Sequence, residues 1–151
     1  MNHRRSGYTL LELVVVILVG SVITSIAITS FNGVSGRFAV KGARTTFQAL
    51  HARARAQAIE FGRSVRLNVD VSGDSVWLTV ADRTLETVRF GKEFNVDIKT
   101  SSLTDLRVCM NPRGFADPRC NSYSSPITVM FVLDGDTASV EILTLGQLLV
   151  N

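Results

Sequence analysis

GYTLLELVVVILVG, residues 7–20, is an almost entirely hydrophobic stretch with one glutamate, Glu12, close to its start. Leu, Val and Ile dominate the chain as far as Phe31. A helix over these roughly 24 positions extends about 36 Å at 1.5 Å per residue, and the hydrocarbon core of a bilayer is about 30 Å thick. The sequence therefore predicts a transmembrane helix over residues 8–31.

Basic residues on one side of this run indicate its orientation. Arg4 and Arg5 precede it, and the next basic residue is Arg37, so the positive-inside rule keeps the N-terminus in the cytoplasm. Two other interpretations use the same residues. One is a secretory signal peptide cleaved after Ala27, because residues 25–27 have a small-x-small pattern, and the other is a plain uncleaved anchor.

Glu12 argues against both of these interpretations. An acidic side chain near the hydrocarbon costs several kcal/mol unless it is paired, so such a residue is a functional candidate by default. The composition of its own helix offers Glu12 no partner.

Residues 6–12, SGYTLLE, resemble the type IV prepilin processing motif. The resemblance implies that a prepilin peptidase removes leader 1–7 by cutting between Gly7 and Tyr8, and that Tyr8 is then N-methylated. Tyr8 stands where that family more often has Phe, which keeps an aromatic ring. In pilin-like filaments the glutamate pairs with the new amine of a neighbouring subunit, which makes Glu12 an assembly residue.

The same resemblance implies location and partners. It predicts a single-pass inner-membrane protein with a periplasmic C-terminal domain, which other pilin or pseudopilin subunits take up into a filament. At 151 residues and 46% hydrophobic composition, the chain has room for one globular domain besides the anchor. Its formal charge of +3 is uneven, because residues 37–66 carry seven Lys or Arg against one acidic residue, whereas residues 67–151 carry seven against eleven.

A second helical stretch, residues 32–62, is predicted to be amphipathic and periplasmic. We expect a break or bend at residues 32–36, because each glycine costs about 1 kcal/mol in a helix interior. An apolar stripe should pack on the globular domain: Val40, Ala43, Phe47, Leu50, Ala54, Ala58 and Phe61. A neighbouring cationic stripe is either solvated or in contact with acidic surfaces of other subunits or with phospholipid head groups: Arg37, Lys41, Arg44, His51 and Arg55.

The hydrophobic period changes to 2 in residues 63–151, which predicts a β-rich domain. Turns are expected at residues 72–74 and 134–136. Strands are expected over residues 65–71, 76–80, 85–90, 94–98, 106–110, 127–133 and 139–145. A long N-terminal helix packed on a C-terminal antiparallel β-domain is an α+β architecture, like that of pilin-like proteins.

Three further segments are similar to the GspH/FimT group of minor pseudopilins: ARARAQAIEFGR at residues 52–63, NPRGFA at 111–116 and VEILTLGQL at 140–148. With the processing motif they favour a minor pilin or pseudopilin, a structural subunit of a type II secretion pseudopilus or a type IV pilus. The sequence leaves the choice between these two machines open.

The only two cysteines, Cys109 and Cys120, flank a loop-like stretch. In an oxidising compartment they suit one disulfide, which would contribute about 3 kcal/mol by restricting the unfolded chain. Two reduced thiols are the alternative.

No arrangement of residues indicates catalysis, a cofactor or a metal. The histidines are His3 and His51, and the common metal, nucleophile and phosphate-loop motifs are missing. Asp134 and Asp136 are interpreted as a hairpin turn and not as a calcium site, because the other ligands of a calcium loop are missing. Trp77 is expected on the face opposite Leu78, partly exposed, and no role is assigned to it.

Nucleic acid is the alternative ligand, because FimT-like relatives assist DNA uptake through basic residues near the chain's end. This chain departs from that pattern, since no Lys or Arg follows Arg119. Arg107, Arg113 and Arg119 are the candidates for a phosphate-binding patch.

Overall fold

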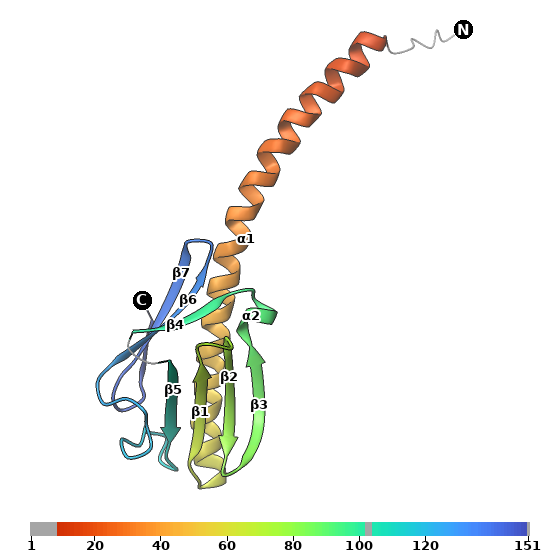
Figure 1. Cartoon of the computed structure of the whole chain (residues 1–151). Coiled ribbons are helices and arrows are strands. Elements are labelled where there is room, and N and C mark those ends of the chain that lie inside the picture. The colour runs from red at the N-terminus through yellow and green to blue at the C-terminus, as the bar shows by residue number, and fades with distance from the viewer. Residues whose placement is uncertain (1–8, 102–103, 151) are drawn as a thin grey trace, which may run out of the picture. The chain divides into compact units, whose positions relative to one another are not determined.

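One long helix, α1, extends from Leu10 to Phe61 (Figure 1). The computed structural model describes residues 9–101 and 104–150, and of residues 26–34 it describes the backbone alone. Contacts within the chain divide it into two units, Met1–Ser35 and Gly36–Asn151.

The break expected at residues 32–36 is wrong, because α1 continues through them as α-helix. Each glycine there opposes the helix by only about 1 kcal/mol. Once a helix is nucleated, every further residue adds a hydrogen bond, so the long flanking stretches carry it through.

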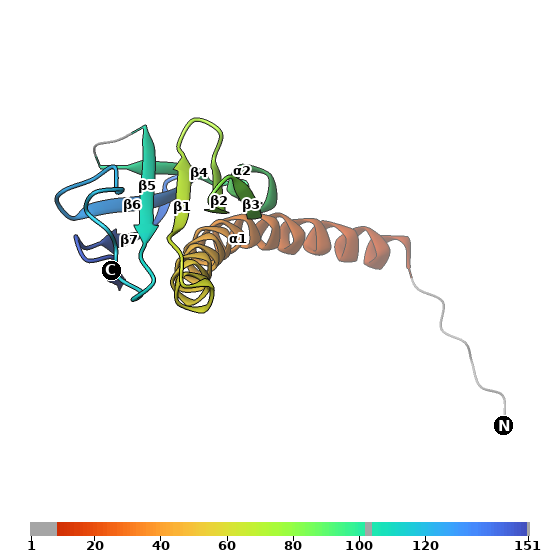
Figure 2. The same ribbon diagram turned by 90° about the horizontal axis from the view of Figure 1, so that it is seen from below.

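Two four-stranded antiparallel sheets accompany the second half of α1 in the unit Gly36–Asn151. Their strand orders are β3-β2-β1-β5 and β4-β6-β7-β8, and in Figure 2 the strands of the second sheet run across those of the first. The bounds are β1 Val65–Asp70, β2 Ser75–Val80, β3 Arg83–Arg89, α2 Phe90–Glu93, β4 Asp97–Thr100, β5 Asp105–Met110, β6 Ile127–Leu133, β7 Asp136–Ile142 and β8 Leu148–Val150. The predicted α+β class, a long helix with antiparallel sheets, is confirmed.

Two elements of the β-domain differ from expectation. The strand expected over residues 94–98 is displaced, because α2 ends at Glu93 and Asn95 adopts a left-handed conformation with φ 56° before β4 begins. Strand β8 was not expected; it follows Gly146, whose φ is 80°, and it pairs with β7 over three residues. Left-handed residues of this kind redirect the chain without changing its hydrophobic pattern.

Side-chain alternation brings the strands' apolar residues into one core. In β1 the buried positions alternate with partly exposed ones, as the period of 2 predicts. The α1 stripe contributes six buried residues from Val40 to Ala58. Its predicted seventh member, Phe61, is 46% exposed, because α1 ends there.

Three phenylalanines connect separate elements within this core. Phe131 on β6 lies with its ring centroid 5.6 Å from that of Phe47 on α1 and 5.5 Å from that of Phe90 on α2. All three side chains are fully buried. Aromatic pairs at this separation contribute roughly 0.5–1.5 kcal/mol beyond the contribution of their buried area. Phe131 therefore stabilises the packing of β6 on α1 and on α2.

Candidate functional site

The start of α1 carries the last part of the processing motif. Gly7 and Tyr8 lie outside the described residues, and their role stays a prediction. Thr9 precedes the helix, and its Oγ1 accepts a hydrogen bond of 3.3 Å from the Glu12 N–H. Threonine followed three residues later by glutamate is the capping-box pattern, and a carboxylate is favoured in the first turn of a helix. Sequence reasoning missed this capping role of Thr9.

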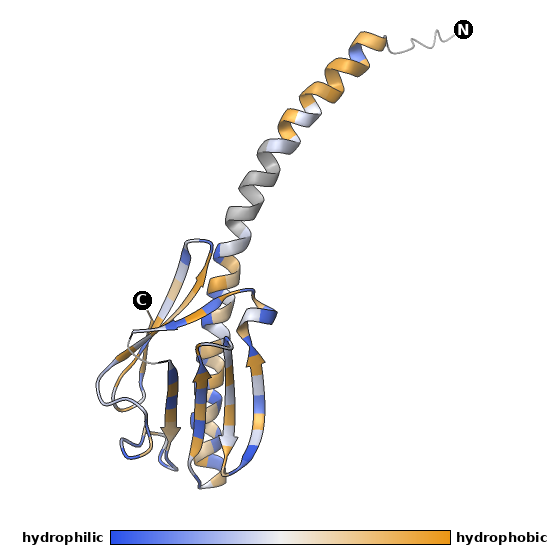
Figure 3. Cartoon of the chain, viewed as in Figure 1, coloured by the Kyte–Doolittle hydropathy of each residue, from blue (hydrophilic) through white to orange (hydrophobic). Residues whose placement is uncertain are grey.

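The first part of α1 consists mostly of hydrophobic residues, which are orange in Figure 3. All eleven Leu, Val and Ile residues from Leu10 to Ile23 are exposed, by 47% to 83%. The hydroxyls of Ser21 and Thr24 donate to helix carbonyls at 2.7 and 2.8 Å, so they add little polarity to that surface. Within residues 9–101 and 104–150, no helix combines the length and mean hydropathy of a membrane-crossing segment. A continuous apolar surface of this size marks an interaction site.

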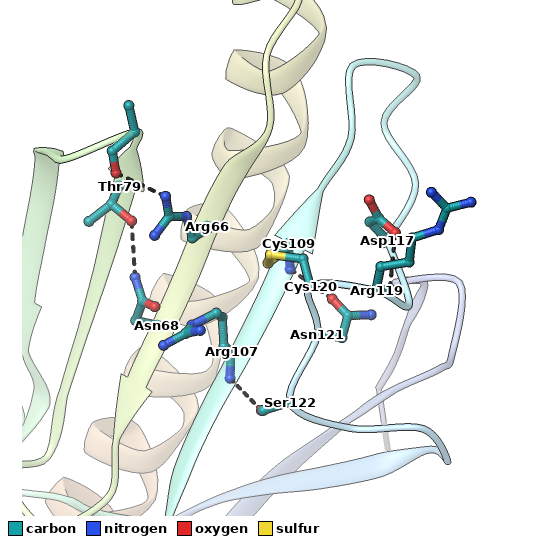
Figure 4. The surroundings of a disulfide bond; sticks show 11 residues. Arg66, Asn68, Thr79, Arg107, Cys109, Asp117, Arg119, Cys120, Asn121 and Ser122 are labelled. Carbon is teal, nitrogen blue, oxygen red and sulfur yellow. Dashed lines mark hydrogen bonds between the residues drawn. A yellow bond between two sulfur atoms is a disulfide. The ribbon is translucent and has the colours of Figure 1, made fainter.

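Cys109 on β5 and Cys120 form a disulfide in the structure, with Cα atoms 5.7 Å apart (Figure 4). The chain after Cys120 runs back along β5: Asn121 Oδ1 accepts from the Cys109 N–H at 2.8 Å, and Ser122 Oγ accepts from the Arg107 N–H at 2.8 Å. The Ser122 N–H in turn donates to the Arg107 carbonyl at 3.1 Å. The disulfide and these bonds hold residues 120–122 beside the first sheet.

The three candidate phosphate-binding arginines lie on two elements, β5 and the loop between the cysteines. Arg107 extends from β5 toward β1, whereas Arg119 points away from β1 (Figure 4). Arg113 and Arg119 belong to the loop between the cysteines, where their backbone N–H groups donate to Asn111 and Asp117 side chains. Arg107 and Arg119 thus extend in different directions, and a nucleic-acid role for the three arginines stays a prediction.

The three segments similar to the GspH/FimT group meet at the end of α1. The Arg55 guanidinium lies 5.8 Å from the Phe115 ring centroid. A Cβ added to Gly114, whose φ is 79°, would stand 2.9 Å from Ile59, so only glycine lets this loop approach the helix so closely. The Ala116 N–H donates to the Leu145 carbonyl at 3.0 Å, which joins the loop to the C-terminal segment.

His51 was predicted on the cationic stripe, and the structure corrects this by burying it, at 5% exposure. Its Nε2 has no hydrogen-bond partner among the described residues. Burial and, to a smaller extent, the positive charge of Arg55 lower the pKa of His51 to about 4, although a hydrogen bond with the Gly146 backbone acts in the opposite direction. The C-terminal segment covers this helix position, which helical spacing does not reveal.

We expect the stability of the protein to fall as the pH is lowered through the acid range because of His51. The unfolded imidazole takes up its proton near pH 6.5, whereas the folded one takes it up only near pH 4, so protons favour the unfolded state between these values. A difference of this size corresponds to about 3 kcal/mol, which is fully present above pH 6.5 and fully lost below pH 4. Denaturant unfolding at several pH values should show this loss in the wild type and a much smaller one in His51→Gln. An identical pH dependence in both proteins would contradict the assignment.

Two other members of the cationic stripe make contacts within the chain. Arg37 Nε lies 3.5 Å from Asp136 Oδ1, and Arg55 contacts Phe115, whereas Lys41 is exposed. Arg37 and Arg55 therefore do not belong to a purely solvated face.

The turn predicted at residues 134–136 is present, and Asp136 is already the first residue of β7. Leu133 pairs with Asp136, and Asp134 and Gly135 form the two-residue connection with φ of 48° and 91°. Positive φ at both positions is typical of the turns that join two-residue hairpins. The described residues contain no group of three His, Cys, Asp or Glu suited to a metal ion.

Within the described residues, an apolar helix capped by Thr9 continues into a unit with two antiparallel sheets. The Prokaryotic N-terminal methylation motif matches residues 2–28. The match covers the start of α1 and none of the β-domain.

The fold is similar to that of the type IV minor pilin FimU of Pseudomonas aeruginosa strain PAO1 in two crystal forms. One comparison gives a TM-score of 0.58 at 15% identity, covering 74% of this chain and 87% of that structure. The other gives 0.56 at 15% identity, covering 74% and 91%. No curated protein sequence matches the chain at a significant level.

Proposed function

We propose that the chain is a minor pilin or pseudopilin, a structural subunit of a type IV pilus or a type II secretion pseudopilus. One observation carries this proposal: the methylation motif at residues 2–28 leads into a helix whose apolar side chains from Leu10 to Ile23 are all exposed. Such a surface needs a cover of hydrocarbon or of other apolar helices.

The proposed maturation has two chemical steps. Prepilin peptidase cuts between Gly7 and Tyr8 on the cytoplasmic side, and the new amine of Tyr8 is methylated. Until assembly, the apolar part of α1 holds the subunit in the inner membrane with the β-domain in the periplasm. On assembly, that part of α1 packs against the equivalent helices of neighbouring subunits.

Glu12 directs this packing in the proposal. Its carboxylate forms an ion pair with the positively charged Tyr8 amine of a neighbouring subunit, so that the two charges neutralise each other in an apolar bundle. Thr9 bonds the Glu12 backbone N–H and not its carboxylate, and the next cationic residue along α1 is Arg37, so the carboxylate is available to another chain.

Membership of the GspH/FimT group is part of the same proposal. The contact of Arg55 with Phe115 and the hydrogen bond of Ala116 to Leu145 support it, since they join residues from all three similar segments. The likeness to FimU concerns the fold and does not select between the pilus and the secretion pseudopilus.

Mass spectrometry of the mature N-terminus tests the proposal most directly. We expect the purified membrane-associated protein to begin with N-methylated Tyr8. A protein that begins at Ile28, after cleavage behind Ala27, would instead be an exported soluble protein. An intact N-terminus in cells that hold an active prepilin peptidase would also reject the proposal.

A further inference from the structure

The outer face of the first sheet carries a depression for which the filament function has no use. Asn68 on β1 pairs in register with Trp77 on β2 and with Arg107 on β5, so one row of side chains crosses three strands. The depression has a volume of about 550 Å³, within the range of roughly 300–1,000 Å³ typical of small-molecule sites. Four more polar side chains line it: Asp70, Ser72, Asp105 and Ser122.

Several polar groups of this row have unused hydrogen-bonding capacity. Among the described residues, the indole N–H of Trp77, the guanidinium of Arg107 and the carboxylate of Asp105 have no hydrogen-bond partner. Asn68 donates from Nδ2 to Thr79 Oγ1 at 3.2 Å, which leaves its Oδ1 as an acceptor. The depression therefore offers donors and acceptors close to an aromatic ring.

One wall of the depression is held in place covalently. Ser122 stands at the rim because the disulfide anchors Cys120 to β5 and because Ser122 exchanges two hydrogen bonds with the Arg107 backbone. The opposite end is ordered by Asp70, which accepts hydrogen bonds from the backbone N–H groups of Ser72 and Gly73 at 2.9 and 3.0 Å. Both walls are thus in position before a ligand arrives, which reduces the entropy cost of binding.

The charges of the lining exclude most ligand classes. Asp70 and Asp105 lie directly opposite each other on β1 and β5, and the Ser72 hydroxyl and the Gly73 N–H lower the pKa of Asp70, which keeps it ionised. Two carboxylates repel a phosphate, and Arg107 offsets one of their two charges, which weakens the attraction for a cation. An apolar ligand would cover the unpaired donors and acceptors without giving them hydrogen-bond partners.

A ligand of this depression should pack on an aromatic ring and also pair with hydrogen-bond donors and acceptors. A sugar ring can do both, because its C–H face is apolar and its hydroxyls both donate and accept. We propose that this depression binds a neutral saccharide, whose ring stacks on Trp77 while its hydroxyls bond to Asn68, Arg107 and Asp105. The proposal concerns the periplasm-facing domain alone and does not depend on the filament function.

Trp77 is the only tryptophan of the chain, so its fluorescence reports on the site directly. The experiment uses the full chain in a detergent without a sugar head group, titrated with glucose, galactose, N-acetylglucosamine and their trisaccharides. We expect at least one of these to change the Trp77 emission saturably at millimolar concentration, and we expect the change to persist at high salt because the ligand is neutral.

Substitutions test whether the saccharide binds in this depression. Arg107→Ala and Asn68→Ala should each weaken the apparent affinity about tenfold, the effect of losing a hydrogen bond that involves a buried or charged group. Trp77→Ala, followed through the ligand's own NMR signals, should abolish binding. Arg119→Ala is the matched control, since this exposed arginine does not line the depression, and it should bind like the wild type.

Three results would overturn the proposal, provided circular dichroism shows that each variant is folded. The first is no response to any saccharide by fluorescence or ligand NMR. The second is a response that Arg107→Ala and Asn68→Ala leave unchanged. The third is a response to a single-stranded oligonucleotide alone, weakening with salt and on Arg113→Ala or Arg119→Ala, which would make the region a nucleic-acid site instead.

Discussion

Replacing Glu12 with alanine is expected to remove the subunit from filaments while leaving it in the membrane fraction. The proposed pair joins Glu12 to the Tyr8 amine of a neighbour, and losing one partner of a buried ion pair costs about 3 to 5 kcal/mol. At one such contact per subunit, this corresponds to a loss of roughly 100-fold or more in the association constant. The measurement is the amount of the subunit in sheared or affinity-purified filaments, compared with its total amount in the cell.

A glutamine variant separates assembly from helix capping. Glu12 follows Thr9 at the capping-box spacing, and glutamine serves that position nearly as well as glutamate. Glu12→Gln therefore keeps the helix start and removes the charge, so it should be lost from filaments like Glu12→Ala. Normal incorporation of Glu12→Gln would show that the charge is dispensable and would reject the pairing, whereas a defect in alanine alone would point to the cap.

The strands were predictable where one face of the sheet is buried and the other is not. In β1 and β6 the buried and partly exposed positions alternate, and this alternation is visible in the sequence. The turn at Asp134 and Gly135 was predictable as well, because few residues other than these types tolerate positive φ. Both signals are local, which is why one sequence suffices to find them.

Features that depend on distant segments were not predictable. His51 has the helical spacing of an exposed residue, and it is buried because the segment near Gly146 covers it. Strand β8 depends on pairing with β7 and has no alternation of its own. The row of Trp77, Asn68 and Arg107 exists only through the registers of three strands, so the sequence showed an isolated tryptophan.

The second large effect is expected for Phe131→Ala, which removes the central aromatic side chain of the β-domain and should lower its free energy of unfolding. Phe131 is fully buried between Phe47 and Phe90, and truncation of such a side chain costs about 3–5 kcal/mol, from lost transfer free energy and the cavity left behind. Since a domain of this size is stable by only about 5–15 kcal/mol, we expect a large fall in the unfolding midpoint.

Phe38→Ala is the matched control for this substitution, because Phe38 is 70% exposed on α1. It removes the same atoms without opening a cavity, and alanine favours the helix, so the free energy of unfolding should change by less than about 0.5 kcal/mol. Both variants are measured by denaturant unfolding of the full chain in the same detergent, followed by near-ultraviolet circular dichroism. Equal effects for the two would mean that the core is not centred on Phe131, since only a packed core distinguishes one phenylalanine from the other.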